Sequence, residues 1–153
     1  MRITKDNINQ FIEVTTHLYY CSDNGITGID YIPEGITHLY CGENKLTELP
    51  KLPENLIYLD YNNNKLTELP KLPNGLISLY CYNNELTELP KLPEGLINLY
   101  CGSNKLTELP KLPESLTHLY CFYNNLPYKI TIDNFKEHNK LIKRKEILSK
   151  ICT

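Results

Sequence analysis

The chain has 153 residues, a formal net charge of -2, 12 tyrosines, 10 prolines and six cysteines, and it contains no tryptophan. A net charge this close to zero provides no overall field toward nucleic acid or an anionic membrane, so we expect neither as a partner. No apolar run approaches the roughly 20 residues of a membrane-spanning helix. The segment from Met1 to Asp6 lacks the apolar core of a secretory signal, so we expect a cytoplasmic or otherwise intracellular protein, or one exported by a route that leaves no such signal. Without a signal peptide, we expect its cysteines to stay reduced.

Residues 1–15 do not fit the pattern of the chain that follows. Ile8, Phe11 and Ile12 are spaced at i, i+3 and i+4, which predicts a short amphipathic helix. We expect this segment to be an N-terminal cap that hides one end of the core formed by the following residues.

Residues 16–126 are built on a 20-residue repeat. The string LTELPKLP occurs four times at this interval, at Leu46–Pro53, Leu66–Pro73, Leu86–Pro93 and Leu106–Pro113. Between the strings lies a second constant block, such as Leu39-Tyr40-Cys41 followed by Asn44. A fixed period of this length predicts a solenoid in which each repeat stacks on its neighbours. The first repeat is irregular, because Leu18-Tyr19-Tyr20-Cys21 carries one residue more. The extra residue predicts either a small bulge in the strand or a register in which Tyr19 takes the leucine position.

The pattern LxxLxCxxNxL, as in Leu96 to Leu106, resembles a leucine-rich repeat, and the 20-residue length with LPxLP resembles the short class found in bacterial effector proteins. The resemblance implies a leucine-rich-repeat solenoid of the α/β class in the broad sense. Its short parallel strands would line the concave side, extended polyproline II segments would form the convex side, and helices would cap the ends.

The residue types agree with that fold. In an extended segment such as Asn98 to Cys101, alternate side chains point to opposite faces, so Leu99 and Cys101 face the core and Tyr100 faces solvent. Two prolines three residues apart exclude a helix from each LPKLP segment. With three residues per turn, such a segment places its leucines inward and its charged residues outward.

Residues 127–153 change in character. Tyr128 to Ile132 alternates in polarity, which predicts a last edge strand. A helix running to about Lys150 should follow and lie over the open end of the core as a C-terminal cap. Its apolar residues fall mostly on one face: Phe135, Leu141, Ile142, Leu148 and Ile151. Its basic residues are mixed with acidic ones, which indicates a solvated surface rather than a nucleic-acid site.

Each repeat carries an asparagine at the same position. In leucine-rich repeats this position implies a buried amide that bonds to backbone groups of its own and neighbouring turns. We interpret these asparagines as structural: Asn24, Asn44, Asn64, Asn84, Asn104 and Asn124.

Cysteines also form a column, at a position that faces the core: Cys21, Cys41, Cys81, Cys101 and Cys121. Buried cysteine behaves as a small hydrophobe, and we interpret the column as structural. Adjacent strands would bring neighbouring Cα atoms within disulfide range, but their parallel Cβ directions argue against a bond. The sequence has no CxxC pair and no histidine cluster of zinc-site spacing, so we expect no metal and no cofactor.

One enzyme alternative follows from the family resemblance. Some bacterial effectors with similar repeats carry a separate ubiquitin-ligase domain with a Cys-x-Asp nucleophile motif, and Cys21-Ser22-Asp23 matches those letters. Cys21 is in register with the core column, and we expect no room for a second, catalytic domain. We therefore interpret the match as accidental.

The exposed face of the predicted sheet carries a tyrosine column, formed by Tyr20, Tyr40, Tyr80, Tyr100 and Tyr120. Stacked tyrosines stabilise neighbouring strands, and rigid amphipathic rings are also frequent at binding hot spots. The predicted partner-binding residues are His38, Tyr40, Tyr58, Asp60, Tyr80, Tyr82, Tyr100, His118 and Tyr120.

Leu59-Asp60-Tyr61 stands where the other repeats have Leu-Tyr-Cys. Two interpretations remain open. In one, the change is sequence drift, with Tyr61 filling core space and keeping its hydroxyl near the edge. In the other, Asp60 is a polar centre for ligand recognition between Tyr40 and Tyr80.

These observations predict a monomeric, non-catalytic module that binds another protein through its concave, tyrosine-rich sheet, with an effector-like role by analogy. The alternatives are a ligase-type effector enzyme with a cysteine nucleophile and a purely structural repeat protein.

Overall fold

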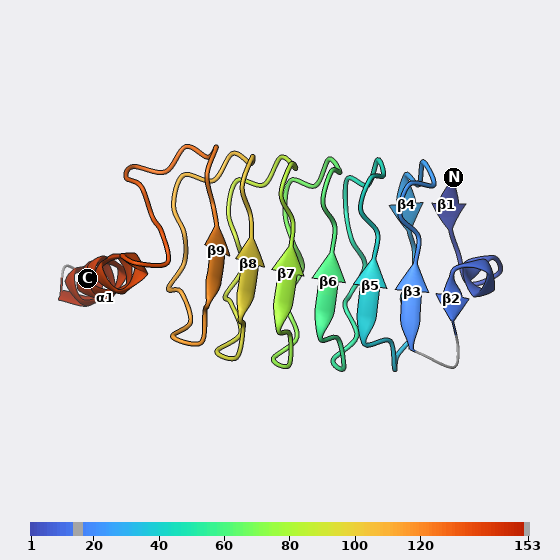
Figure 1. Cartoon of the computed structure of the whole chain (residues 1–153), viewed down its shortest axis with the longest axis horizontal. Coiled ribbons are helices and arrows are strands. Elements are labelled where there is room, and N and C mark those ends of the chain that lie inside the picture. The colour runs from blue at the N-terminus through green and yellow to red at the C-terminus, as the bar shows by residue number, and fades with distance from the viewer. Residues whose placement is uncertain (14–16, 152–153) are drawn as a thin grey trace.

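Short parallel strands stack along the whole length of the molecule (Figure 1). The structure is a computed structural model that describes residues 1–13 and 17–151. Its main sheet has seven strands: β2 (Ile12–Glu13), β3 (Leu18–Tyr20), β5 (His38–Tyr40), β6 (Tyr58–Asp60), β7 (Ser78–Tyr80), β8 (Asn98–Tyr100) and β9 (His118–Tyr120). All neighbours pair in parallel except β2, which runs antiparallel to β3. This arrangement confirms the solenoid predicted from the repeat.

Strand register follows the 20-residue repeat. Leu39 pairs with Leu59, and each strand from β5 onward pairs with residues 20 positions later. In the irregular first repeat, Tyr19 pairs with Leu39 and Tyr20 pairs with Tyr40. Tyr19 therefore takes the leucine position, which confirms one of the two registers predicted and excludes the bulge.

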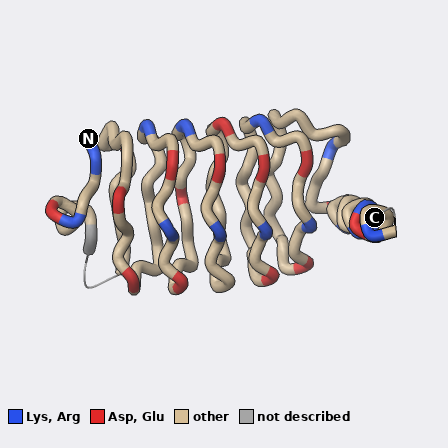
Figure 2. Tube along the Cα trace, turned by 180° about the vertical axis from the view of Figure 1, so that it is seen from behind, with Lys and Arg blue, Asp and Glu red and all other residues tan. Residues whose placement is uncertain are grey.

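The core is a line of stacked apolar layers. The middle strand residues Leu39, Leu59, Leu79 and Leu99 are fully buried. The second leucine of each LPKLP segment is also buried, at Leu52, Leu72, Leu92 and Leu112, as the three-residue period predicts. The glutamates and lysines of these segments are exposed, and Figure 2 shows them in rows across the back of the solenoid.

Each turn leaves its strand through a residue with left-handed backbone. The φ values lie between 52° and 58° at Asp23, Glu43, Asn63, Asn83, Ser103 and Tyr123. Asparagine and aspartate tolerate this region better than other residues with a Cβ. The bend positions the following asparagine of each repeat toward the core.

The N-terminal segment differs from the predicted helix. A single 3₁₀ turn, η1 (Ile8–Gln10), is followed by β2, which pairs with β3. A second small sheet joins β1 (Arg2–Ile3) in parallel to β4 (Gly28–Ile29). Pairing with the solenoid edge supplies backbone hydrogen bonds that a longer helix would otherwise make internally, so the helix prediction was wrong beyond one turn. The side chain of Ile12 lies outside the described part of the structure.

The C-terminal segment confirms the predicted helical cap but not the predicted edge strand. Residues 128–132 form no strand, and Ile130 and Phe135 instead close the end of the core as buried side chains. Helix α1 (Phe135–Ile151) then leads away from the sheet (Figure 1). Phe135 of the predicted apolar face covers the core, whereas Leu148 and Ile151 are 60% and 73% exposed, so the later part of that face does not reach it. Among the described helices, none is both long enough and apolar enough to cross a membrane.

Polar contacts hold the start of α1 against the last turn. The side-chain amide of Asn139 donates to the carbonyl of Leu112 at 2.7 Å and accepts from the N–H of Leu112 at 2.8 Å. The buried His138 donates from Nε2 to the carbonyl of Pro110 at 3.0 Å, since a carbonyl can only accept.

Candidate interaction surface on the exposed sheet face

The first and third residues of each strand point outward, while the middle residue points into the core. This alternation follows from the strand geometry and is seen in the burial of β5, β6 and β8. It brings eight of the predicted binding residues onto one face: His38, Tyr40, Tyr58, Asp60, Tyr80, Tyr100, His118 and Tyr120. We call this surface the exposed sheet face; it also includes Tyr20, Ser78 and Asn98.

Tyrosine rings on the exposed sheet face form a stack. The Tyr20 and Tyr40 rings lie 4.8 Å apart with an interplanar angle of 9°, and the Tyr80 and Tyr100 rings lie 4.8 Å apart at 13°. Tyr120 continues the stack at 6.3 Å from Tyr100. Parallel strands set this spacing, and each ring buries part of its neighbour.

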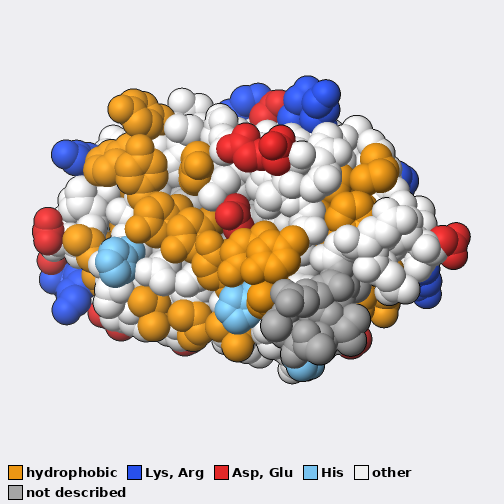
Figure 3. All heavy atoms as spheres, turned by 45° about the vertical axis from the view of Figure 1, so that its right-hand side comes forward, with side chains coloured by type: hydrophobic (Ala, Val, Ile, Leu, Met, Phe, Trp, Pro, Cys, Tyr) orange, Lys and Arg blue, Asp and Glu red, His pale blue; other side chains and the backbone are white. Residues whose placement is uncertain are grey.

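Tyr58 bridges the gap that Asp60 leaves in the tyrosine column. Its ring lies 4.8 Å from Tyr40 and 5.2 Å from Tyr80, although Tyr58 belongs to the neighbouring column with His38. The stack is therefore continuous from Tyr20 through Tyr58 to Tyr120. Figure 3 shows a band of hydrophobic side chains with acidic side chains set into it and beside it.

Asp60 lies beside this bridge as a half-buried carboxylate. Its Oδ1 accepts a hydrogen bond of 3.0 Å from the backbone N–H of Asn62. Burial raises the pKa of Asp60, the Glu43 carboxylate adds to the rise, and the Asn62 hydrogen bond opposes it. Burial, followed by the charge of Asp60, also raises the pKa of Tyr58. Ionising the Asp60 carboxylate therefore costs more free energy in the folded protein than in water.

Tyr82 lies just beyond β7, outside the stack. Its backbone N–H donates to the side-chain oxygen of Asn62 at 3.0 Å, and its hydroxyl accepts from the Asn63 amide at 3.4 Å. Both contacts place Tyr82 against the loop residues that follow Asp60 in sequence.

Three residues near Asp60 were not among the predicted binding residues: Asn62, Gly42 and Glu43. Their only sequence signal is that these loop positions vary from repeat to repeat.

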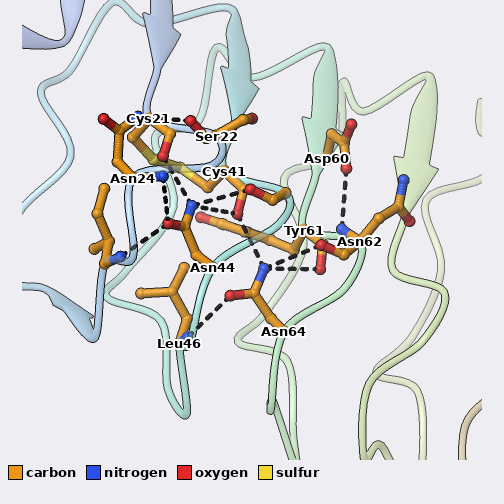
Figure 4. Close-up of a disulfide and its surroundings, with 12 residues drawn as sticks. Cys21, Ser22, Asn24, Cys41, Asn44, Leu46, Asp60, Tyr61, Asn62 and Asn64 are labelled. Atoms are coloured by element: carbon orange, nitrogen blue, oxygen red, sulfur yellow. Dashed lines mark hydrogen bonds between the residues drawn. A yellow bond between two sulfur atoms is a disulfide. The ribbon is translucent and has the colours of Figure 1, made fainter.

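Tyr61 enters the core, as expected for its place in the cysteine column. It is fully buried, but its hydroxyl is not near an edge: the hydroxyls of Tyr61 and Tyr19 are both buried without a hydrogen-bond partner among the described residues. The drift interpretation was wrong on this point. The Tyr61 ring extends across the core toward Cys41 (Figure 4). It occupies space that the smaller cysteine side chain of the other repeats would not fill.

The asparagine column forms a ladder of hydrogen bonds between turns (Figure 4). Asn64 accepts from the N–H of Leu46 at 2.9 Å and donates to the carbonyl of Cys41 at 3.0 Å, both in the preceding turn. Asn44, Asn84, Asn104 and Asn124 make equivalent bonds. Asn24 is an exception, because it is exposed and bonds locally to Ser22.

Cys21 and Cys41 are joined by a disulfide (Figure 4), which contradicts the expectation of reduced cysteines throughout. Both lie one residue beyond their strands, with Cα atoms 4.8 Å apart. This separation is within disulfide range, and the argument from parallel Cβ directions did not hold there. Because Cys21 is bonded and fully buried, it offers no free thiolate for the ligase-type chemistry considered from sequence.

The next three cysteines of the column are free and buried: Cys81, Cys101 and Cys121. Burial raises the pKa of Cys81 to about 12 and that of Cys121 to about 11, and it raises the pKa of Cys101 as well. Such thiols are poor nucleophiles at neutral pH. Within residues 1–13 and 17–151, no group of three His, Cys, Asp or Glu side chains is placed to hold a metal ion.

The sequence matches no protein-family model and no curated protein. Several solved structures are similar, including the following two. The leucine-rich-repeat domain of a Shigella effector has a TM-score of 0.77 and 32% identity, covering 84% of this chain and 59% of that one. YopM from Yersinia enterocolitica WA-314 has a TM-score of 0.64 and 33% identity, covering 70% of this chain and 26% of that one. This chain therefore spans only part of each of these proteins.

Proposed function

We propose that this chain, a leucine-rich-repeat protein with the short repeats of bacterial effector leucine-rich-repeat domains, is a non-catalytic module that holds a partner protein on its exposed sheet face. The observation that carries the proposal is the continuous ring stack from Tyr20 through Tyr58 to Tyr120. Rigid aromatic side chains lose little conformational entropy on binding and are frequent at interface hot spots.

The distribution of charge supports a protein partner rather than nucleic acid. Strands β3 and β5–β9 contain no lysine or arginine. Affinity for nucleic acid comes largely from such residues on phosphates. The lysines of the LPKLP segments form a row on the back beside a row of glutamates, and other basic residues lie along one edge of the solenoid (Figure 2). We further propose that the module acts as a monomer, in which the exposed sheet face is open to the partner.

A purely structural role is the second candidate, because the stack also joins neighbouring strands. The two roles differ in what surface substitutions do. A scaffold needs the rings for stability alone, whereas a binding surface needs them for a specific partner as well.

Affinity capture with matched variants tests the proposal. Tyr80→Ala, Tyr100→Ala and Tyr120→Ala would be combined in one variant. A control would combine Glu68→Ala, Lys71→Ala and Glu88→Ala on the back. Unfolding curves identify any variant that fails to fold. We expect the control to recover the same partner as wild type and the tyrosine variant to lose it. Equal recovery by both folded variants, or capture of no specific protein, would overturn the proposal.

A further inference from the structure

We propose that Asp60 and the tyrosines around it form a binding site for an arginine side chain of the partner. The inference rests on the proposed function for the existence of a partner, and it adds the chemistry by which that partner is recognised. Three features of Asp60 and its neighbours lead to it: a carboxylate without an ion pair among the described residues, adjoining aromatic rings, and strands without basic side chains.

The carboxylate lacks a cation. Among the described residues, the backbone N–H of Asn62 is the donor to Asp60, and none of the ion pairs found includes it. Glu43 lies near enough to oppose its ionisation. A half-buried carboxylate of this kind has little water and no counter-ion, so an incoming cation would be favoured there.

The rings beside Asp60 suit a planar cation. Tyr40, Tyr58 and Tyr80 are consecutive members of the stack, separated by 4.8 Å and 5.2 Å. Asp60 pairs in register with Tyr40 on one side and Tyr80 on the other. The faces of these rings are covered by one another and by Tyr20 and Tyr100, so the rings supply apolar surroundings rather than a free face. A guanidinium is weakly hydrated and binds a carboxylate through two parallel N–H donors, which suits a half-buried carboxylate in such surroundings. Lysine has a single ammonium group and can use only part of this arrangement.

The charge of the exposed sheet face complements a basic partner. Its strands carry Asp60 as their only formal charge apart from histidine, and none of them contains a lysine or arginine to compete for it. In the view of Figure 3 the hydrophobic band contains acidic and histidine side chains but no lysine or arginine.

A matched pair of short peptides tests the inference. The probe is acetyl-Gly-Arg-Gly-amide, and the control replaces arginine with citrulline, which has nearly the same shape without the charge. Binding is followed by the NMR shift of the Asn62 amide, which donates to Asp60. We expect a saturable shift with the arginine peptide and none with citrulline. Asp60→Asn should weaken binding about tenfold, because it keeps the acceptor for Asn62 and removes the charge.

Glu68→Gln, on the back of the solenoid, serves as the matched variant and should bind the probe like wild type. Equal affinity in wild type and Asp60→Asn, or equal shifts with both peptides, would overturn the inference. The outcome is separable from the proposed function. If the probe fails while tyrosine substitution still abolishes partner capture, the binding surface stands and only the arginine site is wrong. If the probe binds but no protein is captured, the site stands without its partner.

Discussion

The carboxylate of Asp60 accepts a hydrogen bond of 3.0 Å from the backbone N–H of Asn62, in a position where other repeats place a tyrosine ring. Burial raises the pKa of Asp60 above its ordinary value of 3.8. Folding therefore favours the protonated form. The stabilisation from this group is fully present below pH 3.8 and is lost as the pH rises through the higher pKa of the folded state.

Asp60→Asn should accordingly raise the free energy of unfolding at pH 7, with a gain over wild type that shrinks toward pH 3.5. Urea unfolding at both pH values measures the difference, and Glu68→Gln on the exposed back should change little at either. A gain that is absent at pH 7, or that grows on acidification, would contradict the assigned pKa direction.

The asparagine ladder predicts a large and position-dependent loss of stability. Asn84 accepts from the N–H of Leu66 and donates to the carbonyls of Tyr61 and Cys81. Asn84→Ala leaves the N–H of Leu66 buried and unpaired, while the two carbonyls keep the amides of Asn64 and Asn104 as donors. We therefore expect a loss of about 2–3 kcal/mol.

The exposed Asn83, next to Asn84 in sequence, provides the matched control. Asn83→Ala should cost about 1 kcal/mol, because its partner groups can bond to water and the remaining cost is the left-handed backbone, which alanine tolerates less well than asparagine. Denaturant unfolding of both variants gives the comparison. Similar losses for Asn83→Ala and Asn84→Ala would show that the ladder is not what joins the turns.

The Cys21–Cys41 disulfide should stabilise the N-terminal turns. It closes a loop of 20 residues, for which chain entropy predicts a loss of about 3 kcal/mol on reduction. We expect dithiothreitol to lower the melting temperature of wild type and to leave a Cys21→Ser/Cys41→Ser variant unchanged. Peptide mass mapping without reductant should recover the bonded pair. Recovery of both residues as free thiols after aerobic purification would count against the bond.

Tyr61 carries a buried hydroxyl with no partner among the described residues, so its removal should not harm the fold. We expect Tyr61→Phe to raise the free energy of unfolding by about 1 kcal/mol, because the ring stays and an unpaired polar group is lost. Tyr80→Phe, whose hydroxyl is on the exposed face, should be near neutral. A clear loss of stability in Tyr61→Phe would indicate that the hydroxyl has a partner, such as a buried water.

The repeat made most of the architecture predictable. Leu39 and its equivalents recur with the period of the strands, and the prolines of LPKLP exclude a helix, so the inward and outward faces follow from the sequence. The position of the Tyr58 ring does not follow from the sequence. Its ring leaves its own column to bridge Tyr40 and Tyr80, which depends on a side-chain rotamer and on the space beside Asp60.

The two ends were less predictable for a different reason. Amphipathic spacing around Leu141 and Leu148 indicates an apolar face but not whether anything covers it. Here Ile130 and Phe135 already close the core, and Asn139 attaches the helix through polar contacts that no sequence pattern marks. The Cys21–Cys41 bond was missed because strand spacing permits it and only local orientation decides it.

Site-specific photo-crosslinking tests most directly whether a partner lies on the exposed sheet face. A benzoyl-phenylalanine would replace Tyr100 in the stack in one protein and Glu88 on the back in another, and both would be irradiated in the same lysate. We predict a specific crosslinked protein from position 100 and none from position 88. The same adduct from both positions, or an adduct from position 88 alone, would contradict a binding surface on the tyrosine stack.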